Sequence, residues 1–211
     1  MAEIKTESCE KGMLICMKNT KTVVLIVFMA MMLVVSSGCG GDKSSDTIKK
    51  WEPKNKEDAA VIGMLAQDSG YSVVEFETSK EMKNVSLGYD YYKGGKFIKD
   101  CKCGRVEQIE NSKTEGLAGV AFEEGKYITF YSEKEGGGGS VTGDLEGWEK
   151  GDASGLGFAG LEDEKAFVLG EKCYIAAYVS GGNLADPDTM LGDKELLKKN
   201  KKSWFFYVKI K

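Results

Sequence analysis

The side chains of this 211-residue chain that could carry chemistry are carboxylates and thiols. Two acidic groups stand out, Glu162-Asp163-Glu164 and Asp186-Pro187-Asp188. Carboxylate oxygens bind calcium, and two carboxyl groups about 5 to 10 Å apart can hydrolyse a glycosidic bond. Neither group has the spacing of a calcium loop, and acidic residues are common in exposed turns. We therefore interpret both groups as solvated loops and predict no catalytic residue and no metal site.

Three thiols follow residue 39 in the chain, those of Cys101, Cys103 and Cys173. On a strand, Cys101 and Cys103 would point to the same face, because they are two residues apart. One interpretation is a disulfide from Cys101 or Cys103 to Cys173, formed in an oxidising compartment. The other is three reduced, buried thiols that pack as small apolar side chains. The sequence leaves both open, but three thiols without histidine make a poor zinc site.

Histidine is absent, which removes the usual general base near neutral pH and the commonest metal ligand. Proteases and esterases built on Ser/His or Cys/His pairs are thereby excluded within this chain. Arg105 is the only arginine, and the lysines are dispersed among acids. Because nucleic-acid-binding surfaces use basic stripes and bidentate arginines, we predict no nucleic-acid partner.

A glycine pattern at Gly155, Gly157 and Gly160 matches the G-x-G-x-x-G spacing of dinucleotide-binding loops. That motif works between an apolar strand and a helix, where the pyrophosphate meets the helix N-terminus. Here charged residues precede and follow the glycines, which favours a chance match. We predict no nucleotide and no other cofactor.

Short β-rich segments separated by turn residues predict the scaffold. Alternation at 85–92 and a Gly94-Gly95 turn followed by 96–103 indicate a hairpin. The other predicted strands are 71–78, 116–122, 126–132, 166–169, 172–180 and 204–211. About eight short strands, with short helices at 58–67 and 193–200, predict a mostly β fold, an antiparallel sandwich or open barrel.

The N-terminal region has the three parts of an export signal. Lys18 and Lys21 precede an uninterrupted apolar run, Val23 to Val35, which is followed by Ser36-Ser37-Gly38-Cys39. Thirteen residues of helix reach about 20 Å, too short for about 30 Å of hydrocarbon. The run Val35-Ser36-Ser37-Gly38-Cys39 resembles the lipobox of bacterial lipoproteins, although Ser36 stands where leucine is usual. The resemblance covers Met17 to about Gly41 and implies lipidation at Cys39, with the chain anchored in the cell membrane on its extracytoplasmic side.

The sequence also predicts how the chain is divided. Residues 1–38 are the expected signal peptide. Acidic residues before Met17 are atypical of such a signal, so we expect translation to begin at Met17, with Met13 as the less favoured alternative. The small, polar and lysine-rich segment 39–57 predicts a flexible tether. Residues 58–211 form the expected single domain. Of 29 basic and 33 acidic residues, four and three precede Cys39, which leaves 25 and 30 and a net charge of −5.

For function, we expect a non-enzymatic binding module that is tethered to the membrane and recognises an extracytoplasmic protein or glycan. The alternative is a carboxylate-based hydrolase of cell-wall or exogenous glycans. Tyr89, Tyr91, Tyr92, Tyr174 and Tyr178 could form an aromatic sugar platform, but their strand positions favour packing. The binding hypothesis predicts an exposed apolar patch on a sheet face or at a loop end.

Overall fold

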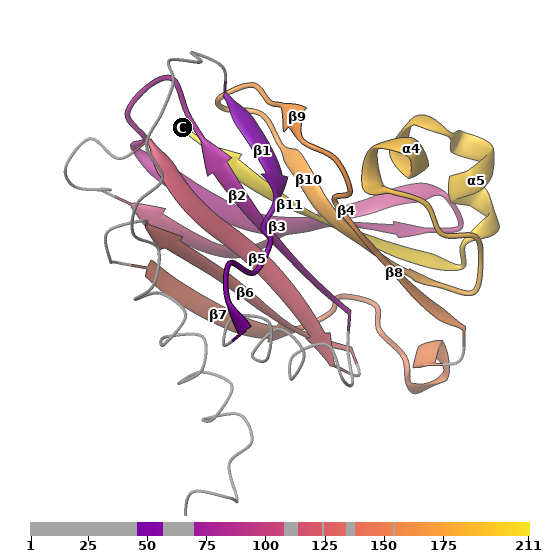
Figure 1. Ribbon diagram of the computed structural model, residues 1–211. Helices are drawn as coiled ribbons and strands as arrows, with labels where there is room; N and C mark the ends of the chain where they lie inside the picture. The colour runs from indigo at the N-terminus through magenta and orange to yellow at the C-terminus, as the bar shows by residue number, and fades with distance from the viewer. Residues whose placement is uncertain (1–45, 57–69, 108–113, 124, 134–137, 154) are drawn as a thin grey trace, which may run out of the picture.

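A computed structural model gives the arrangement of the chain, and it describes residues 46–56, 70–107, 114–123, 125–133, 138–153 and 155–211. Cys39, the expected signal peptide and the predicted helix 58–67 lie outside these residues. The described part is a β-sandwich of two antiparallel sheets with two short helices (Figure 1). This confirms the mostly β sandwich that the sequence predicts.

The first layer is a six-stranded sheet. In spatial order it contains β7 (Gly138–Asp144), β6 (Lys126–Glu133), β5 (Glu115–Glu123), β2 (Tyr71–Glu77), β1 (Thr47–Lys50) and β9 (Lys165–Ala166).

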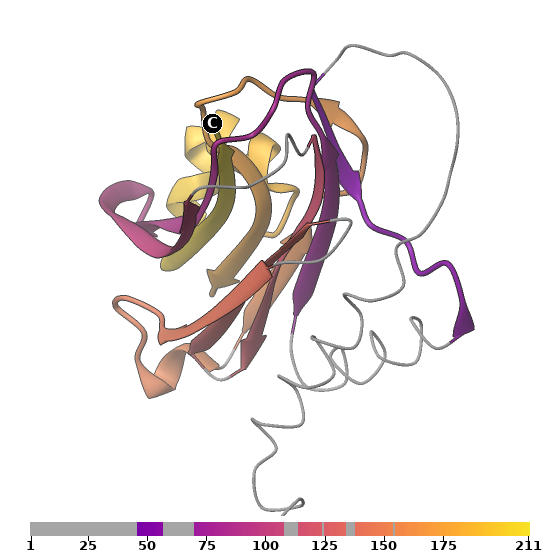
Figure 2. The same cartoon turned by 90° about the vertical axis from the view of Figure 1, so that its left-hand side faces the viewer.

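The second layer is a five-stranded sheet that faces the first (Figure 2). In spatial order it contains β4 (Lys96–Glu107), β3 (Asn84–Lys93), β11 (Lys202–Ile210), β10 (Cys173–Ser180) and β8 (Leu156–Gly160). A 3-10 turn, η1 (Lys150–Ala153), precedes β8.

Aromatic side chains from both sheets fill the core between the layers. Phe206 of β11 packs against Tyr89 of β3 and against Phe122 and Tyr127 of the opposite sheet, with ring centroids 4.7 to 5.8 Å apart. Trp204 is fully buried beside them. Because each aromatic ring removes a large apolar area from water, these contacts fix the two sheets against each other.

Helices α4 (Pro187–Gly192) and α5 (Lys194–Lys199) cover part of the outer face of the five-stranded sheet (Figure 1). Asp186 and Asp193 cap them, since each carboxylate accepts two backbone N–H groups of the first turn. Met190 and Leu197 are buried against this face of the sheet. The predicted helix at 193–200 is therefore confirmed as α5.

The structure corrects the predicted tether, because residues 47–51 belong to the domain. β1 pairs with β2 and β9, and the backbone N–H of Trp51 donates to Val73 O at 2.9 Å. Ile48 is fully buried and Trp51 is 8% exposed. The segment is held in the domain as a strand because these two side chains are buried. The lysine-rich residues around them led the sequence to predict a tether instead.

Strands β7 and β8 are further differences from the sequence-based prediction, since both fall in the glycine-rich region from residue 135 to 160. Backbone pairing with β6 and β10 holds them in the sheets, although glycine has a low β propensity. No helix in the described ranges is long and apolar enough to cross a bilayer.

Candidate functional site

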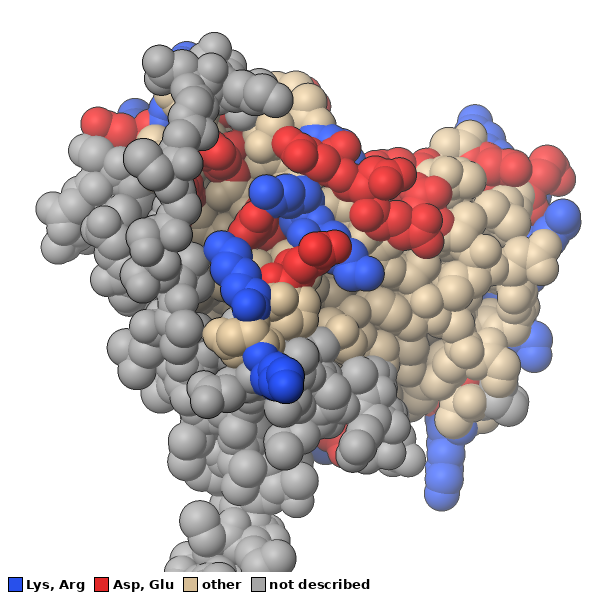
Figure 3. All heavy atoms as spheres, viewed as in Figure 1, with Lys and Arg blue, Asp and Glu red and all other residues tan. Residues whose placement is uncertain are grey.

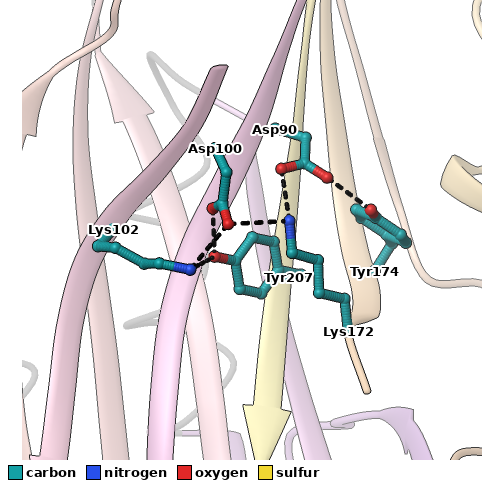
Figure 4. Close-up of polar contacts among 6 residues, drawn as sticks. All are labelled: Asp90, Asp100, Lys102, Lys172, Tyr174 and Tyr207. Carbon is teal, nitrogen blue, oxygen red and sulfur yellow. Dashed lines mark hydrogen bonds and ion pairs between the residues drawn. The ribbon is translucent and has the colours of Figure 1, made fainter. Parts of the chain in front are cut away.

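The outer face of the five-stranded sheet carries a group of polar side chains beside the two helices. We call it the Lys172 cluster; it consists of Asp90, Asp100, Lys102, Lys172, Tyr174 and Tyr207 (Figure 4). They come from β3, β4, β10 and β11, and from the turn just before β10. Four strands of one sheet are therefore joined by polar contacts on the same face.

Lys172 lies at the centre of this cluster, between two carboxylates. Its Nζ atom is 2.7 Å from an oxygen of Asp90 and 3.2 Å from one of Asp100. Asp90 and Asp100 are directly opposed on β3 and β4, where two like charges would repel. The shared ammonium offsets that repulsion, and Lys102 adds a second positive charge 2.8 Å from Asp100. The four charges therefore sum to zero.

Two tyrosines complete the hydrogen bonding of these carboxylates. The Tyr174 hydroxyl donates to Asp90 and the Tyr207 hydroxyl donates to Asp100, each at 2.6 Å. Tyr207 reaches β4 by lying across β3 at Gly88, where a Cβ atom would be 2.4 Å from its hydroxyl oxygen. Any larger residue at position 88 would therefore displace the tyrosine.

The electrostatics of the cluster act on the pKa values of Asp100, Tyr174 and Tyr207. Burial of the Asp100 carboxyl raises its pKa, but hydrogen bonds from Lys102, Tyr207 and Lys172 outweigh burial and lower the pKa to about 2. Burial raises the pKa of Tyr174 and Tyr207, and the hydrogen bond to a carboxylate raises it further. Asp100 is thus an ionised acceptor and both tyrosines are neutral donors, an arrangement suited to holding strands in place rather than to proton transfer near pH 7.

A second polar group, which we call the Lys202 cluster, lies where η1 meets β10 and β11. It consists of Glu149, Asp152, Ser180 and Lys202. The Lys202 ammonium is 2.7 Å from Asp152 and 3.2 Å from Glu149, and Asp152 also accepts the backbone N–H of Glu149. These contacts fasten the loop before β8 to the sheet.

The tip of the β3–β4 hairpin is the described surface that most resembles a binding site. We define it as the hairpin tip, formed by Lys93, Lys96, Phe97, Ile98 and Lys99. Phe97 is 54% exposed and Ile98 is 52% exposed, and all three lysines are exposed. Gly94 and Gly95 both have positive φ, as the predicted two-residue turn requires. Two adjacent large apolar residues are therefore exposed at this loop end.

The hairpin tip is held by its neighbours rather than free in solvent. Phe97 packs edge-on against Tyr92, whose ring packs in the same way against Phe205. Gly95 lies so close to α5 that a Cβ atom would be 2.8 Å from the side chain of Lys198. The Phe97 ring and the turn are therefore held in place by contacts within the domain.

The two acidic groups that the sequence offered for calcium or glycan chemistry lie in a helix cap, an ion pair and an exposed loop. Asp186 caps α4, and Asp188 pairs with Lys165, which also donates to Tyr174 O at 3.0 Å. Glu162, Asp163 and Glu164 are exposed between β8 and β9. Within the described part of the chain, no three His, Cys, Asp or Glu side chains converge to hold a metal ion.

The three cysteines in the domain are free thiols, so the bridge from Cys101 or Cys103 to Cys173 is not formed in this structure. Strands β3 and β11 separate β4 from β10, a distance of about 14 Å at about 4.8 Å per strand. A disulfide needs Cα atoms within about 7 Å. Burial raises the pKa of Cys103 to about 12 and that of Cys173 to about 11, so both thiols are protonated at neutral pH.

Two other sequence patterns resolve into packing. Tyr89, Tyr91 and Tyr178 are buried in the core, whereas Tyr92 and Tyr174 lie on the outer face with α4 and α5. These five rings therefore do not form one platform. Of the G-x-G-x-x-G glycines, Gly155 directly precedes β8, and Gly157 and Gly160 lie within this edge strand, so the motif does not form a loop before a helix.

Sequence reasoning missed the Lys172 cluster, although Asp90 in the middle of an aromatic strand was a usable signal. A charged residue with 4% exposure must have partners, but the sequence did not show that they come from β4 and β10.

Comparisons with known protein families, with curated proteins and with solved structures found no match to this chain.

Proposed function

We propose that this chain is a lipid-anchored extracytoplasmic protein that binds an acidic protein partner through the hairpin tip. The observation that carries the proposal is the exposure of Phe97 and Ile98, each more than half exposed, within a seven-residue segment that also holds three exposed lysines. Large apolar side chains that are adjacent, exposed and rimmed by charge are typical of protein interaction sites.

The anchor rests on the sequence around Cys39. A diacylglyceryl group on Cys39, with a further acyl chain, would hold the chain stably in a bilayer. Asp46, whose carboxylate accepts hydrogen bonds from Ser79, is the first described residue. Seven residues span at most about 25 Å when extended, so the domain would stay within that distance of the lipid.

Charge favours an acidic partner. The whole chain has a net charge of −4, but the hairpin tip gathers Lys93, Lys96 and Lys99 within seven residues. Lys99 forms an ion pair with Glu146 at 2.5 Å, in which both side chains are about half exposed. Local positive charge of this kind accelerates association with an acidic surface and selects against basic ones.

The rigidity of the hairpin tip favours a protein partner over a glycan. Phe97 is fixed edge-on by Tyr92, so binding would cost little side-chain entropy. Sugars bind best on an open aromatic face with polar groups beside it, whereas Ile98 and Phe97 together offer an apolar contact.

Metabolic labelling with palmitate tests the anchor. We expect label in the full-length chain and loss of the label in Cys39→Ala, with Cys101→Ala as the control that retains it. Label that persists in Cys39→Ala would remove the anchor from the proposal.

Cross-linking on intact cells tests the binding surface. We expect the full-length chain to capture an acidic protein, and Phe97→Ser/Ile98→Ser to lose it by at least about tenfold, since truncating central apolar contacts costs about 2 kcal/mol or more. Val168→Ser is the matched control, because Val168 is an exposed apolar residue outside the hairpin tip, with 60% exposure. Equal capture by both variants, or no captured protein at all, would refute the binding surface.

A further inference from the structure

Strand β8 forms one edge of the five-stranded sheet and pairs with β10 alone among the described strands. The backbone bonds at its two ends join Gly181 N to Gly155 O and Leu161 N to Ile175 O. In an antiparallel ladder, alternate residues bond to the same neighbour. The backbone groups of the intervening residues, at positions 156, 158 and 160, therefore point away from β10 toward the open edge.

The edge of β8 lacks the protection that natural edge strands usually have. Its residues are Leu156-Gly157-Phe158-Ala159-Gly160, with neither charge nor proline. Lysines on edge strands normally prevent pairing with another chain, and β4 at the other edge of the same sheet carries Lys96, Lys99 and Lys102.

The surface beside β8 is apolar or uncharged as well. Leu184 is 43% exposed and lies over Gly157, where a Cβ atom would be 3.4 Å from its methyl group. The residues after β10, Gly181-Gly182-Asn183-Leu184-Ala185, add no charge. Figure 3 shows a broad uncharged surface over β8 and the loop after β10, with acidic side chains gathered beyond one end of this surface. β7, the edge of the other sheet, also lacks lysine, but three of its seven residues are glycine and it ends in the charged Asp144.

Charges of opposite sign lie beyond the two ends of β8. Past Gly160 the chain continues through the exposed acids Glu162, Asp163 and Glu164. At the Leu156 end lie two exposed lysines, Lys150 of η1 and Lys201, whose side chain lies 3.1 Å from a Cβ placed on Gly181. The exposed acid at this end, Glu149, is paired with Lys202. An antiparallel copy of the strand would place the acidic end of one copy beside the basic end of the other, at both ends.

We propose that two copies of this chain associate by antiparallel pairing of β8 with β8. Phe158 lies opposite Phe158 of the other copy and Leu156 lies opposite Gly160, which joins the two five-stranded sheets into one continuous sheet. The contact is isologous and closed, as expected of a dimer rather than a filament. It uses a different edge from the hairpin tip, and it stands whether or not that tip binds a partner.

Site-specific cross-linking on intact cells tests the register. In this pairing residue 157 of one copy lies opposite residue 159 of the other, in a narrow pair with Cα atoms about 4.5 Å apart. Two differently tagged full-length chains, Gly157→Cys and Ala159→Cys, are co-expressed and oxidised mildly. We expect a disulfide dimer that contains both tags, at least about tenfold above either variant alone, since unmatched positions are too far apart to bridge.

The matched control is Ser140→Cys co-expressed with Thr142→Cys, which places the same spacing on the β7 edge. No mixed dimer, or equal cross-linking in the single-variant cells or on β7, would overturn the proposal. If β8 paired with a peptide of another protein instead, no mixed dimer would form.

A charge on the edge provides a second test, in purified full-length chain diluted in excess detergent micelles. Ala159→Lys places like charges close to the two-fold axis and is expected to weaken dimerisation at least about tenfold. Thr142→Lys on β7 should leave the sedimentation behaviour unchanged. Circular dichroism of both variants shows whether they fold, and a folded Ala159→Lys chain that dimerises like the original would refute β8 pairing.

Discussion

Two lysines of the five-stranded sheet each join a pair of carboxylates, but at different depths. The Lys202 side chain is 6% exposed and its partner Asp152 is 9% exposed. The Lys172 side chain is 25% exposed, and its partners Asp90 and Asp100 are 5% and 31% exposed. The Lys202 cluster is therefore dry around its closest ion pair, whereas water reaches one side of the Lys172 cluster.

This difference in depth predicts a difference in energetic role. Removing one partner of a buried ion pair costs more stability than replacing both partners by apolar residues, because the single charge left behind is poorly solvated. Asp152 has one close ammonium, whereas Asp100 keeps Lys102 when Lys172 is removed. The Lys202 cluster should thus tolerate single substitutions less well, although its charges are fewer.

The largest effect is expected from Lys202→Met. The substitution leaves Asp152 buried without its ammonium, and it should lower the free energy of unfolding by about 3 to 5 kcal/mol. Denaturant unfolding followed by tryptophan fluorescence measures the change. Lys202→Met/Asp152→Leu should recover part of the loss, since it removes both charges together. A single variant that unfolds like the original would show that this ion pair is not dry.

Lys172→Met should destabilise less, by about 2 to 3 kcal/mol, because solvent and Lys102 still reach Asp100. The cost comes mainly from Asp90, which loses the Lys172 ammonium and keeps the hydrogen bond from the Tyr174 hydroxyl. Lys126→Met is the matched control, since Lys126 is exposed on the opposite sheet. If Lys172→Met cost as much as Lys202→Met, depth would not explain the difference between the clusters.

The pH dependence of the free energy of unfolding should report the contribution of Asp100 to stability. Because its pKa is lowered to about 2, its contribution to stability is fully present above about pH 4 and is lost as the pH falls through 2. Denaturant unfolding between pH 5 and pH 2 should therefore show decreasing stability, with a smaller slope in Asp100→Asn. An unchanged slope in that variant would contradict the ionised role of Asp100.

The sequence predicted the parts of this fold that depend on local patterns. Alternating residues and the Gly94-Gly95 turn located the β3–β4 hairpin, because these signals are set by neighbours in the chain. β1 and β8 were missed because their backbone pairing with distant strands decides their structure. Their composition, lysine-rich in one and glycine-rich in the other, argues for loops.

The Lys172 cluster could not be predicted, for a reason of register. From the tight turn alone, Asp90 would lie opposite Lys99, an opposite charge. An irregularity near Ile98 shifts the pairing by one residue, so that Asp90 faces Asp100 and the two acids need Lys172. A second shift beside Gly88 follows on the same strand pair. Such shifts come from packing across the sheet and leave no signal in a single sequence.

The smallest expected effect is on thiol reactivity, and it compares the two clusters without unfolding the domain. Cys101 lies between Asp100 and Lys102 on β4 and is partly exposed, whereas Cys173 is buried. Burial raises the pKa of both thiols, to about 11 for Cys173, so alkylation at pH 7.5 should be slow for both, and slowest for Cys173.

Lys172→Met should accelerate alkylation of Cys101 by about two- to fivefold, because it allows β4 to open locally. When the two variants are compared under conditions of equal global stability, Lys202→Met should accelerate alkylation of Cys101 less. Mass spectrometry of the alkylated full-length chain measures each rate, and equal acceleration in both variants would show that Cys101 reports global unfolding instead of the Lys172 cluster.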